Sequence, residues 1–564
     1  MSANPTFNPS NKLAELIAAR KALLNPTSLN IGTGIGAVET KQPEQITEVP
    51  SHAPTPTDRY GHSITYNADQ QAFIDLASSG SSCVLIGSAG TGKTTCMKGV
   101  VSSICLSNSV PILRGHDHKY LPTEVPGIVI ISYTRRAVNN IRKNLSSDMQ
   151  DNCLTFHKLL EYQPEYFEVT DNETGETKTT MRFTPARNPY NPLPEEISTV
   201  IIEESSMLSK EYYDILMEAL PHNPQIIFLG DIYQLPPVFG SAILGYKLTT
   251  LPVIELTQVY RQALNSPIIS LAQDIKNGKT LALTEKVKTE TTDGIITLHP
   301  WKKKLHPEDA CNVSAKFLIQ ALEAGIYNPE EDIILIPFNK GFGTIELNRF
   351  LATALAKRSN SVVHEIIAGF NKHYLRIGEK IMYDREDAEV IAISRNGTYL
   401  GKRPQEPSEH MDYWGACSDQ FHHSDESALN LTGDVDFILE QMSAQAGKEE
   451  EKVNQASHLI TLRLLDTDRE VTISTARELN NCLLGYALTV HKAQGSEWSK
   501  VFILFHGSHA TMLNRELLYT AITRAKNEVY CICEKETFVA GVKSQKIKGT
   551  TLAEKAQYFI GKDA

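Results

Sequence analysis

The sequence of 564 residues predicts an α/β protein with two tandem parallel-sheet domains, a β-hairpin insertion and a small β-barrel-like insertion. Two observations predict this class. Short apolar runs rich in β-branched residues alternate with helical segments, which is typical of strands buried on both faces of a parallel sheet. A glycine-rich loop, residues 87–95, joins the first run to a helix, and a phosphate-binding loop requires this strand–loop–helix order.

The glycine-rich loop reads GSAGTGKTT and fits the pattern G-x-x-x-x-G-K-[ST]. Glycines let backbone N–H groups turn toward phosphate oxygens, and the N-terminus of the following helix attracts the anion. The loop predicts a nucleoside triphosphate with Mg²⁺, in which Lys93 contacts the β- and γ-phosphates and the Thr94 hydroxyl ligates the metal. The loop residues expected to bind the nucleotide are Gly87, Gly90, Gly92, Lys93, Thr94 and Thr95.

Apolar runs continue along both predicted domains. The first domain is expected to span residues 64–258, and the second to combine 259–374 with 476–564. Doubly wound sheets bind ligands beyond the carboxyl ends of their strands, so we expect the nucleotide in a cleft between the domains. The runs predicted to be strands are 83–86, 127–132, 199–202, 226–229, 333–337, 487–490, 501–505 and 529–533.

Three segments fall outside this pattern. Residues 1–63 are predicted to be a flexible tail with one short helix, which is either disordered or docks a partner. Alternation around a turn-rich centre predicts a β-hairpin at 165–184. The segment 375–475 is β-rich at both ends and carries an acidic loop, 406–452, which is either solvated, repels DNA or binds a basic partner.

The charge is unevenly distributed. Twelve acidic residues and two lysines within 406–452 account for most of the net charge of −11, so the remainder is close to neutral and can carry basic patches.

The nine cysteines are scattered, which indicates reduced thiols. With no apolar run of about 18 residues and no secretory signal, we expect no membrane contact and a cytoplasmic location, in a bacterium or a phage-infected host.

Two further strand ends carry candidate catalytic groups. The run 199–202 is followed by Glu203 and Glu204, and a carboxylate at this place in a phosphate-loop enzyme holds Mg²⁺ or polarises the attacking water. We assign Glu204 to water activation and Glu203 to the metal. Gln234, after the run 226–229, carries an amide that can sense the γ-phosphate by hydrogen bonding.

The order of these segments resembles the superfamily 1 helicases, specifically the RecD/Dda-like branch. The resemblance covers about 66–533 and implies two RecA-like domains and an ATP-dependent DNA helicase that translocates 5′→3′ on single-stranded DNA. One departure is Glu203, where most members have Asp. The segments that carry the resemblance are YNADQ at 66–70, YTRRA at 133–137, TFHKL at 155–159, ELTQVYRQ at 255–262, YALTVHKAQGSE at 486–497 and LYTAITRA at 518–525.

Residue roles follow from the resemblance. Gln70 is implied to read the adenine, and Gly495 and Glu497 to bind the nucleotide from the second domain. Arg261 and Arg524 are implied to contact the γ-phosphate during cleavage, since a planar, permanently charged guanidinium suits charge spread over several oxygens. The residues implied to grip single-stranded DNA are Thr134, Arg136, Thr155, His157, Asn339, Thr489 and His491.

The hairpin at 165–184 occupies the position of the pin that splits the duplex in the Dda-like branch, although a plain surface hairpin is the other interpretation. Expected ligands are single-stranded DNA and duplex junctions. A replication or recombination protein could dock on the tail or the acidic loop. The alternatives are a RecD-like motor subunit of a nuclease or recombination complex, an RNA helicase, and an ATPase that remodels protein–DNA complexes without unwinding.

Overall fold

The structure is a computed structural model in which the chain can be described from residue 64 to residue 563 with several gaps. The gaps are 107–109, 171–176, 221, 259–265, 280–286, 292–293, 302–303, 370, 384–385, 400–454 and 466–468. The predicted tail 1–63, the acidic loop 406–452 and Arg261 therefore lie outside the described residues.

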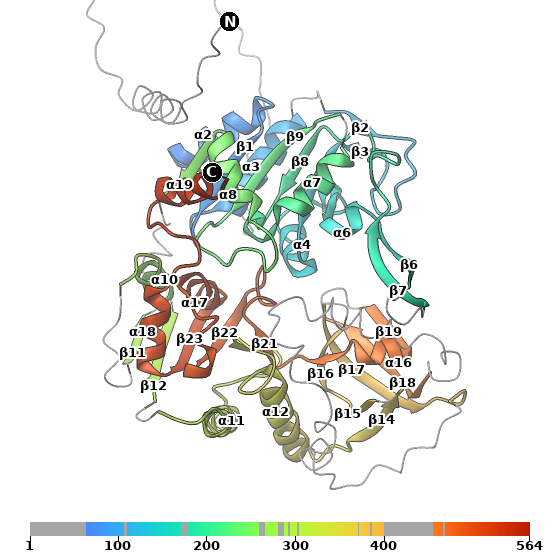
Figure 1. Cartoon of the computed structure of the whole chain (residues 1–564), viewed down its shortest axis with the longest axis vertical. Coiled ribbons are helices and arrows are strands. Elements are labelled where there is room, and N and C mark those ends of the chain that lie inside the picture. Colours follow the sequence, from blue (N-terminus) through green and yellow to red (C-terminus); the bar gives the residue numbers. More distant parts are fainter. Residues whose placement is uncertain are drawn as a thin grey trace, which may run out of the picture. The chain divides into compact units, whose positions relative to one another are not determined.

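The first domain is built on a six-stranded sheet in which every described pairing is parallel (Figure 1). The four predicted strands are confirmed, and the two edge strands, β10 and β5, were not predicted. In spatial order the strands are β10 (Val253–Leu256), β1 (Cys83–Gly87), β9 (Gln225–Gly230), β8 (Thr199–Ile202), β4 (Ile128–Ser132) and β5 (Cys153–Thr155).

Helices cover both faces of this sheet, since alternate residues of its strands enter two different apolar cores. Leu85 and Ile201 pack with residues of α2 and α3, whereas Val84 and Val200 pack with residues of α7 and α8. The remaining elements of this domain are α2 (Ala68–Ser78), α3 (Lys93–Leu106), β2 (Ile112–Leu113), β3 (Val125–Pro126), α4 (Arg135–Arg142), α5 (Ser147–Gln150), α6 (Phe156–Leu159), η1 (Ser205–Met207), α7 (Lys210–Glu218) and α8 (Ile243–Thr250).

The second domain contains another six-stranded sheet, parallel except for the antiparallel edge strand β11. The predicted α/β class with two parallel sheets is confirmed. The strands in spatial order are β11 (Val287–Thr291), β12 (Gly294–Pro300), β23 (Ala525–Cys533), β22 (Trp498–Phe505), β13 (Ile333–Ile336) and β21 (Ala487–Thr489). The helical elements are α10 (Pro267–Lys276), α11 (Pro307–Glu323), α12 (Thr344–Ser359), η2 (Gly507–His509), α17 (Arg515–Ile522), α18 (Lys535–Lys543) and α19 (Leu552–Asp563).

A third sheet forms the β-rich insertion, and its described pairings are antiparallel. It reaches beyond 375–475 on both sides, because β14 and β15 form a hairpin that turns at Gly369, whose φ is +64°. The elements are β14 (His364–Ala368), β15 (Asn371–Leu375), β16 (Lys380–Tyr383), β17 (Glu386–Arg395), β18 (Gln455–Leu464), β19 (Arg469–Thr475), α16 (Ala476–Asn480) and β20 (Leu483–Leu484).

The predicted β-hairpin is confirmed and is longer than 165–184. Strands β6 (Tyr162–Thr170) and β7 (Thr177–Pro185) pair from Tyr162 with Pro185 to Thr170 with Thr177. In the described part of the chain, the two strands form a sheet only with each other.

Helix α19 packs against α8 of the first domain, although residues 476–564 were predicted to belong to the second (Figure 1). The Phe559 ring lies 5.5 Å from the Tyr246 ring, and a Cβ on Gly245 would come within 2.3 Å of Phe559. Glycine at 245 thus allows the close approach of the last helix. None of the described helices is long and apolar enough to cross a membrane.

His509 is a fully buried, neutral histidine at the end of η2. Its Nε2 donates to the Phe342 carbonyl at 2.7 Å, and its Nδ1 accepts the His506 N–H at 3.1 Å. Burial lowers the pKa of His509 to about 4.

We predict that His509 contributes to loss of stability in acid. Because its pKa in the folded chain is below the unfolded value of about 6.5, protonation favours the unfolded chain. The free energy of unfolding should therefore fall as the pH drops from about 6.5 to about 4, by up to about 3 kcal/mol from this residue.

Urea unfolding at several pH values in this range tests this prediction on His509→Gln, whose amide can replace both hydrogen bonds. The variant should lose less stability in acid than the wild type, whereas His306→Gln, at an exposed histidine, should behave like the wild type. An identical pH dependence in all three proteins would contradict the prediction.

Candidate active site

Three loops meet at one edge of the first sheet. They follow β1, β9 and β8, which are neighbours in the order β1-β9-β8 and run parallel. Carboxyl ends of parallel strands lie at the same edge of a sheet. This topology places the glycine-rich loop, the loop carrying Gln234 and the loop carrying Glu203 and Glu204 side by side.

The glycine-rich loop has the backbone that its sequence predicts. Gly90 and Gly92 have φ values of +77° and +88°, in the left-handed region that glycine favours. A Cβ on Gly87 would lie 2.4 Å from the Thr91 hydroxyl, so the loop closes too tightly for a side chain there. Lys93 Nζ donates to the Gly87 carbonyl at 2.8 Å and curls back over the loop. Thr94 and Thr95 lie in the first turn of α3.

Gln70 supports this loop from α2. It forms a reciprocal cap with Asn67, in which each side chain accepts the backbone N–H of the other. Its amide Nε2 lies 3.4 Å from the Thr91 carbonyl, and the side chain is fully buried. The structure thus places Gln70 at the glycine-rich loop.

The carboxylates after β8 sit in an unusual backbone turn. Glu204 has φ +51° and ψ +40°, a left-handed conformation that is uncommon for residues other than glycine. Its Oε2 is buried and has no hydrogen-bond partner in the described part of the chain. Removal from water raises the pKa of Glu203, and the nearby negative charge of Glu204 raises it further, whereas Lys93 and Arg524 oppose the shift.

Gln234 is also buried and carries an acceptor oxygen that is not used by the described residues. Its Oε1 has no hydrogen-bond partner among the described residues. A buried polar group without a partner is costly, so these two oxygens suggest that a ligand or water completes the site. The amide of Gln234 and the carboxylate of Glu204 come from adjacent strand ends, as a site around a terminal phosphate requires.

Two side chains from the second domain reach the same loops, and sequence reasoning did not single them out. The Tyr519 hydroxyl on α17 donates to Asp231 Oδ2 at 2.7 Å and accepts the Ala89 N–H at 3.1 Å. Lys276 Nζ on α10 donates to the Ser88 hydroxyl at 2.9 Å. The only sequence signal was that Tyr519 lies five residues before Arg524 in the same motif.

Arg524 is buried and held in one orientation. Its Nε donates to the Thr520 carbonyl at 3.2 Å and its Nη1 to the Ser496 carbonyl at 3.2 Å. Its charge opposes the rise in the pKa of Glu203, so Arg524 lies within electrostatic range of that carboxylate. The half-exposed Glu497 also acts on the Glu203 pKa, so it lies near the same point.

Gly495 is placed elsewhere. Its carbonyl accepts from Asn140 Nδ2 at 3.0 Å, and a Cβ on it would lie 2.8 Å from the Thr134 hydroxyl. The structure therefore places Gly495 against α4 and its N-cap residue, Thr134.

The threonines and the asparagine predicted to grip DNA each stabilise a local turn. Thr134 and Thr155 accept backbone N–H groups at the starts of α4 and α6, and Thr489 accepts the Lys492 N–H at 3.4 Å. Asn339 accepts the Thr344 hydroxyl at 3.0 Å near the start of α12. A hydroxyl that accepts one bond can still donate its proton, so a threonine cap is compatible with a phosphate contact.

The charged and aromatic DNA candidates lie in different surroundings. The Arg136 guanidinium is buried, forms an ion pair with Asp387 of the insertion and lies 5.4 Å from the centre of the Trp498 ring. The His157 ring lies in an aromatic cluster, 4.9 Å from the Tyr162 ring. Burial lowers the pKa of His491 to about 4, so His491 is a neutral donor or acceptor at pH 7.

The described residues do not form a complete metal site by themselves. No group of three or more His, Cys, Asp or Glu that could hold a metal ion occurs among the residues that can be described. Mg²⁺ in nucleotide sites is bound by one or two protein groups together with phosphate oxygens. A hydroxyl at Thr94 and a carboxylate at Glu203 fit that arrangement.

Two family models and several curated proteins are similar to this chain. The family described as AAA domain matches residues 70–240, and the UvrD-like helicase C-terminal domain matches residues 484–532. The chain is 25% identical over 489 residues to the ATP-dependent RecD2 DNA helicase of Deinococcus radiodurans, covering 86% of this chain and 52% of that protein.

Two RecD proteins are also similar. RecBCD enzyme subunit RecD of Buchnera aphidicola is 25% identical, with 61% of this chain and 56% of that protein covered. The RecD subunit of Mycolicibacterium smegmatis is 23% identical, with 86% and 74% covered. The chain thus spans little more than half the length of the first two of these relatives. A crystal structure of Pif1 helicase from Candida albicans aligns over 89% of this chain and all of that chain, at 15% identity and a TM-score of 0.42.

We predict that Tyr519→Phe slows ATP turnover, because it leaves the Asp231 carboxylate and the Ala89 N–H without their shared partner. Loss of a buried hydrogen bond costs about 1–3 kcal/mol, so a fall of about tenfold in kcat is expected. Steady-state ATP hydrolysis with single-stranded DNA measures the effect.

Tyr530→Phe is the matched control, since the Tyr530 hydroxyl donates to Glu528 within the second domain and touches none of the three loops. The control should retain wild-type turnover. Equal kcat values for Tyr519→Phe and the wild type would show that the hydrogen bonds of the Tyr519 hydroxyl do not contribute to hydrolysis.

Proposed function

We propose that this chain, which belongs to the superfamily 1 helicases of the RecD-like branch, is an ATP-dependent DNA helicase that translocates 5′→3′ on single-stranded DNA and unwinds duplex. The observation that carries the proposal is the meeting of Lys93, Glu204 and Gln234 at one sheet edge, with Arg524 of the second domain within electrostatic range of Glu203. The unpartnered oxygens of Glu204 and Gln234 support a reactive ligand at that edge.

Each group has a proposed role in hydrolysis. The glycine-rich loop binds the phosphates through backbone N–H groups, and Lys93 turns from the Gly87 carbonyl to the β- and γ-phosphates. Thr94 and Glu203 hold Mg²⁺, which neutralises phosphate charge when bound. Glu204 orients a water molecule and accepts a proton from it. The water oxygen attacks the γ-phosphorus as the bond to ADP breaks. Gln234 senses the γ-phosphate by hydrogen bonding.

Arginines from the second domain complete the proposed site. Arg524 stabilises negative charge on the γ-phosphoryl group as it is transferred to water, and Arg261, which lies outside the described residues, is proposed for the same task. Gln70 is proposed to read the adenine. Gly495 and Glu497 are proposed to bind nucleotide when the domains close, which for Gly495 requires leaving α4.

Single-stranded DNA is proposed to bind along the other half of the same sheet edge, beyond β4 and β5. Thr134 and Thr155 lie there, and Asn339, Thr489 and His491 follow strands of the second sheet. Contacts to phosphates alone would make binding tolerant of sequence and sensitive to salt. Arg136 is proposed to exchange Asp387 for a phosphate, and His157 to contact the strand from the aromatic cluster.

The remaining predictions stay proposals. We propose the domain bounds 1–63, 64–258, 259–374 with 476–564, and 375–475, amended in two places: the insertion sheet extends from β14 to β20, and α19 packs on the first domain. The tail and the acidic loop are proposed as docking sites for a replication or recombination protein. A cytoplasmic location is supported by the described cysteines, of which none forms a disulfide.

A RecD-like motor subunit of a nuclease or recombination complex is the second candidate, because several relatives are RecBCD subunits. The purified chain distinguishes the two functions. Unwinding without any partner supports the helicase proposal, whereas unwinding only with added subunits supports the subunit. Displacement of a bound protein without strand separation would support a remodelling ATPase.

We predict that the purified protein unwinds duplexes with a 5′ single-stranded tail and leaves 3′-tailed duplexes intact. Release of a labelled strand in the presence of ATP and Mg²⁺ measures both, and a forked RNA duplex tests the alternative substrate. Unwinding confined to the 3′-tailed duplex would overturn the polarity.

We predict that Lys93→Ala abolishes DNA-stimulated ATP hydrolysis, because the β- and γ-phosphates lose their point charge, while single-stranded DNA binding is retained. Phosphate release and fluorescence anisotropy measure the two properties. Lys98→Ala, at a lysine farther along the same helix, serves as control and should keep both. Normal turnover by Lys93→Ala would refute the assignment of the site.

A further inference from the structure

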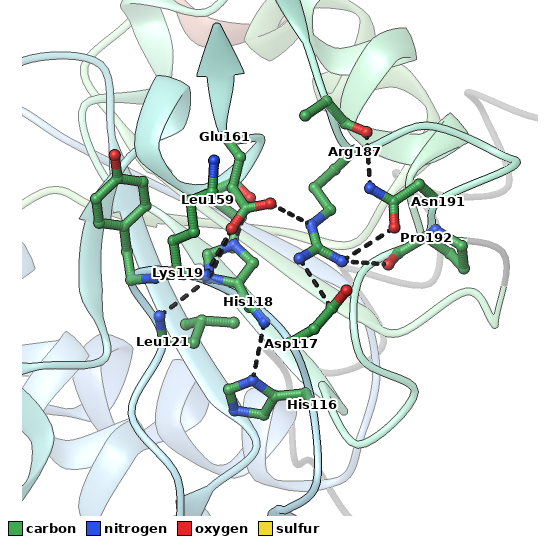
Figure 2. A network of polar contacts seen from close by, with 12 residues as sticks. His116, Asp117, His118, Lys119, Leu121, Leu159, Glu161, Arg187, Asn191 and Pro192 are labelled. Atoms are coloured by element: carbon green, nitrogen blue, oxygen red, sulfur yellow. Dashed lines mark hydrogen bonds and ion pairs between the residues drawn. The ribbon is translucent and has the colours of Figure 1, made fainter.

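A buried polar network joins the two ends of the β6–β7 hairpin (Figure 2). Glu161 directly precedes β6, and Arg187 follows the end of β7 by two residues. Arg187 Nε donates to Glu161 Oε2 at 2.7 Å, and the two side chains are only 3% and 5% exposed. The backbone adds a bond between the same two ends, from the Arg187 N–H to the Leu160 carbonyl at 3.2 Å.

The rest of the Arg187 guanidinium is also engaged. Nη2 donates to Asp117 Oδ1 at 2.9 Å, and Nη1 donates to Asn191 Oδ1 at 3.3 Å and to the Pro192 carbonyl at 3.2 Å (Figure 2). Donors on three sides of a planar group fix both its position and its orientation. Lysine has a single nitrogen at the end of its side chain, so it could not make this set of contacts from three nitrogens.

Glu161 connects the hairpin to the segment between β2 and β3. Its Oε1 accepts the Lys119 N–H at 2.6 Å. The neighbouring His118 is buried, donates from Nε2 to the Leu159 carbonyl at 2.8 Å and accepts the Leu121 N–H at Nδ1. His118 is therefore neutral and anchors the segment that holds Glu161 in place.

The Glu161 carboxylate stays ionised despite its burial. Burial opposes ionisation, but Arg187 and the Lys119 N–H outweigh it and lower the pKa of Glu161. Its φ of +48° is uncommon for this residue type, so the chain enters β6 through a turn that needs support.

The direction of the hairpin depends on the contacts of Glu161 and Arg187 at its base. In the described part of the chain, β6 and β7 pair with no third strand, and an isolated two-stranded hairpin is only marginally stable. Packing of Tyr162 against Phe156 and His157 holds the first residue of β6. The ion pair and these rings thus attach the hairpin to the first domain.

We propose that the Arg187–Glu161 pair is a positioning clamp that holds the hairpin against the duplex, so that strand separation is coupled to translocation. This inference rests on the proposed helicase function. Movement along a single strand meets no duplex and does not need the clamp. Strand separation needs the Arg187–Glu161 pair. Without this pair the hairpin can rotate at its base, and the duplex then displaces the hairpin instead of being separated by it.

The test compares Arg187→Lys with the wild-type full chain in two assays. Arg187→Lys keeps the positive charge but loses the planar guanidinium group with its several N–H donors. ATP hydrolysis on single-stranded DNA should stay within about twofold of wild type, while unwinding of a forked duplex falls by about tenfold or more. Equal losses in both assays would indicate a merely structural residue and overturn the proposal, as would unchanged unwinding.

Two further variants keep the result decisive. Glu161→Gln/Arg187→Met removes both charges and leaves no lone buried ion, so it should fold and show the same selective loss of unwinding. Asp117→Asn is the control, since Asp117 is 82% exposed and asparagine keeps an acceptor for Nη2. A loss in Asp117→Asn as large as in Arg187→Lys would overturn the assignment to the Glu161 pair.

A chain in which a short Gly-Ser linker replaces residues 165–184 separates this inference from the proposed function. If that chain unwinds as well as the wild type, the clamp is overturned and the helicase proposal stands. If the wild type itself does not unwind, the helicase proposal fails first. Loss of unwinding in the linker chain with ATP hydrolysis retained supports the clamp.

Discussion

The parallel pairing of β1 with β9 and of β9 with β8 is the constraint on which the candidate site depends. Three loops far apart in the sequence become neighbours because parallel strands end at a common edge. The same sheet continues through β4 and β5, so Thr134 and Thr155 follow the next strand ends along it. A nucleotide site and a nucleic-acid path can therefore share one edge, and a movement of the second domain can act on both.

Several hydrogen bonds join the two domains beside an apolar cluster to which both domains contribute. Tyr519 bridges Asp231 and Ala89, Gln494 donates to the Leu235 carbonyl at 3.0 Å, and Lys276 reaches Ser88. A hydrogen bond to protein can be replaced by one to water or phosphate at a small net change in free energy, whereas separating an apolar interface exposes surface at a steady cost per unit area. The hydrogen bonds of Tyr519, Gln494 and Lys276 can therefore be exchanged at little cost when the domains separate, whereas the shared apolar cluster opposes separation.

Much of the fold could be predicted from the sequence, because apolar runs and a glycine-rich loop carry local signals. The strands β5 and β10 of the first sheet and β11 and β12 of the second were not predicted. In β10 the charged Glu255 interrupts the apolar run, and β11 carries charged residues at alternate positions. Tyr519 and Lys276 could not be assigned, because their partners depend on how two domains meet. Arg136 was assigned to DNA, but its ion pair with Asp387, which joins α4 to β17, could not be predicted. Arg187 was not singled out, because the sequence shows one arginine in a loop and its partners are far along the chain.

The packing of α19 on α8 has a consequence for biosynthesis. During translation α8 leaves the ribosome long before α19, so the surface around Gly245 and Tyr246 stays uncovered while the second domain and the insertion are made. The first domain can form its sheet early, but it acquires this neighbour only after residues 552–563 have emerged. A nascent chain stalled before that point would present an apolar patch to chaperones.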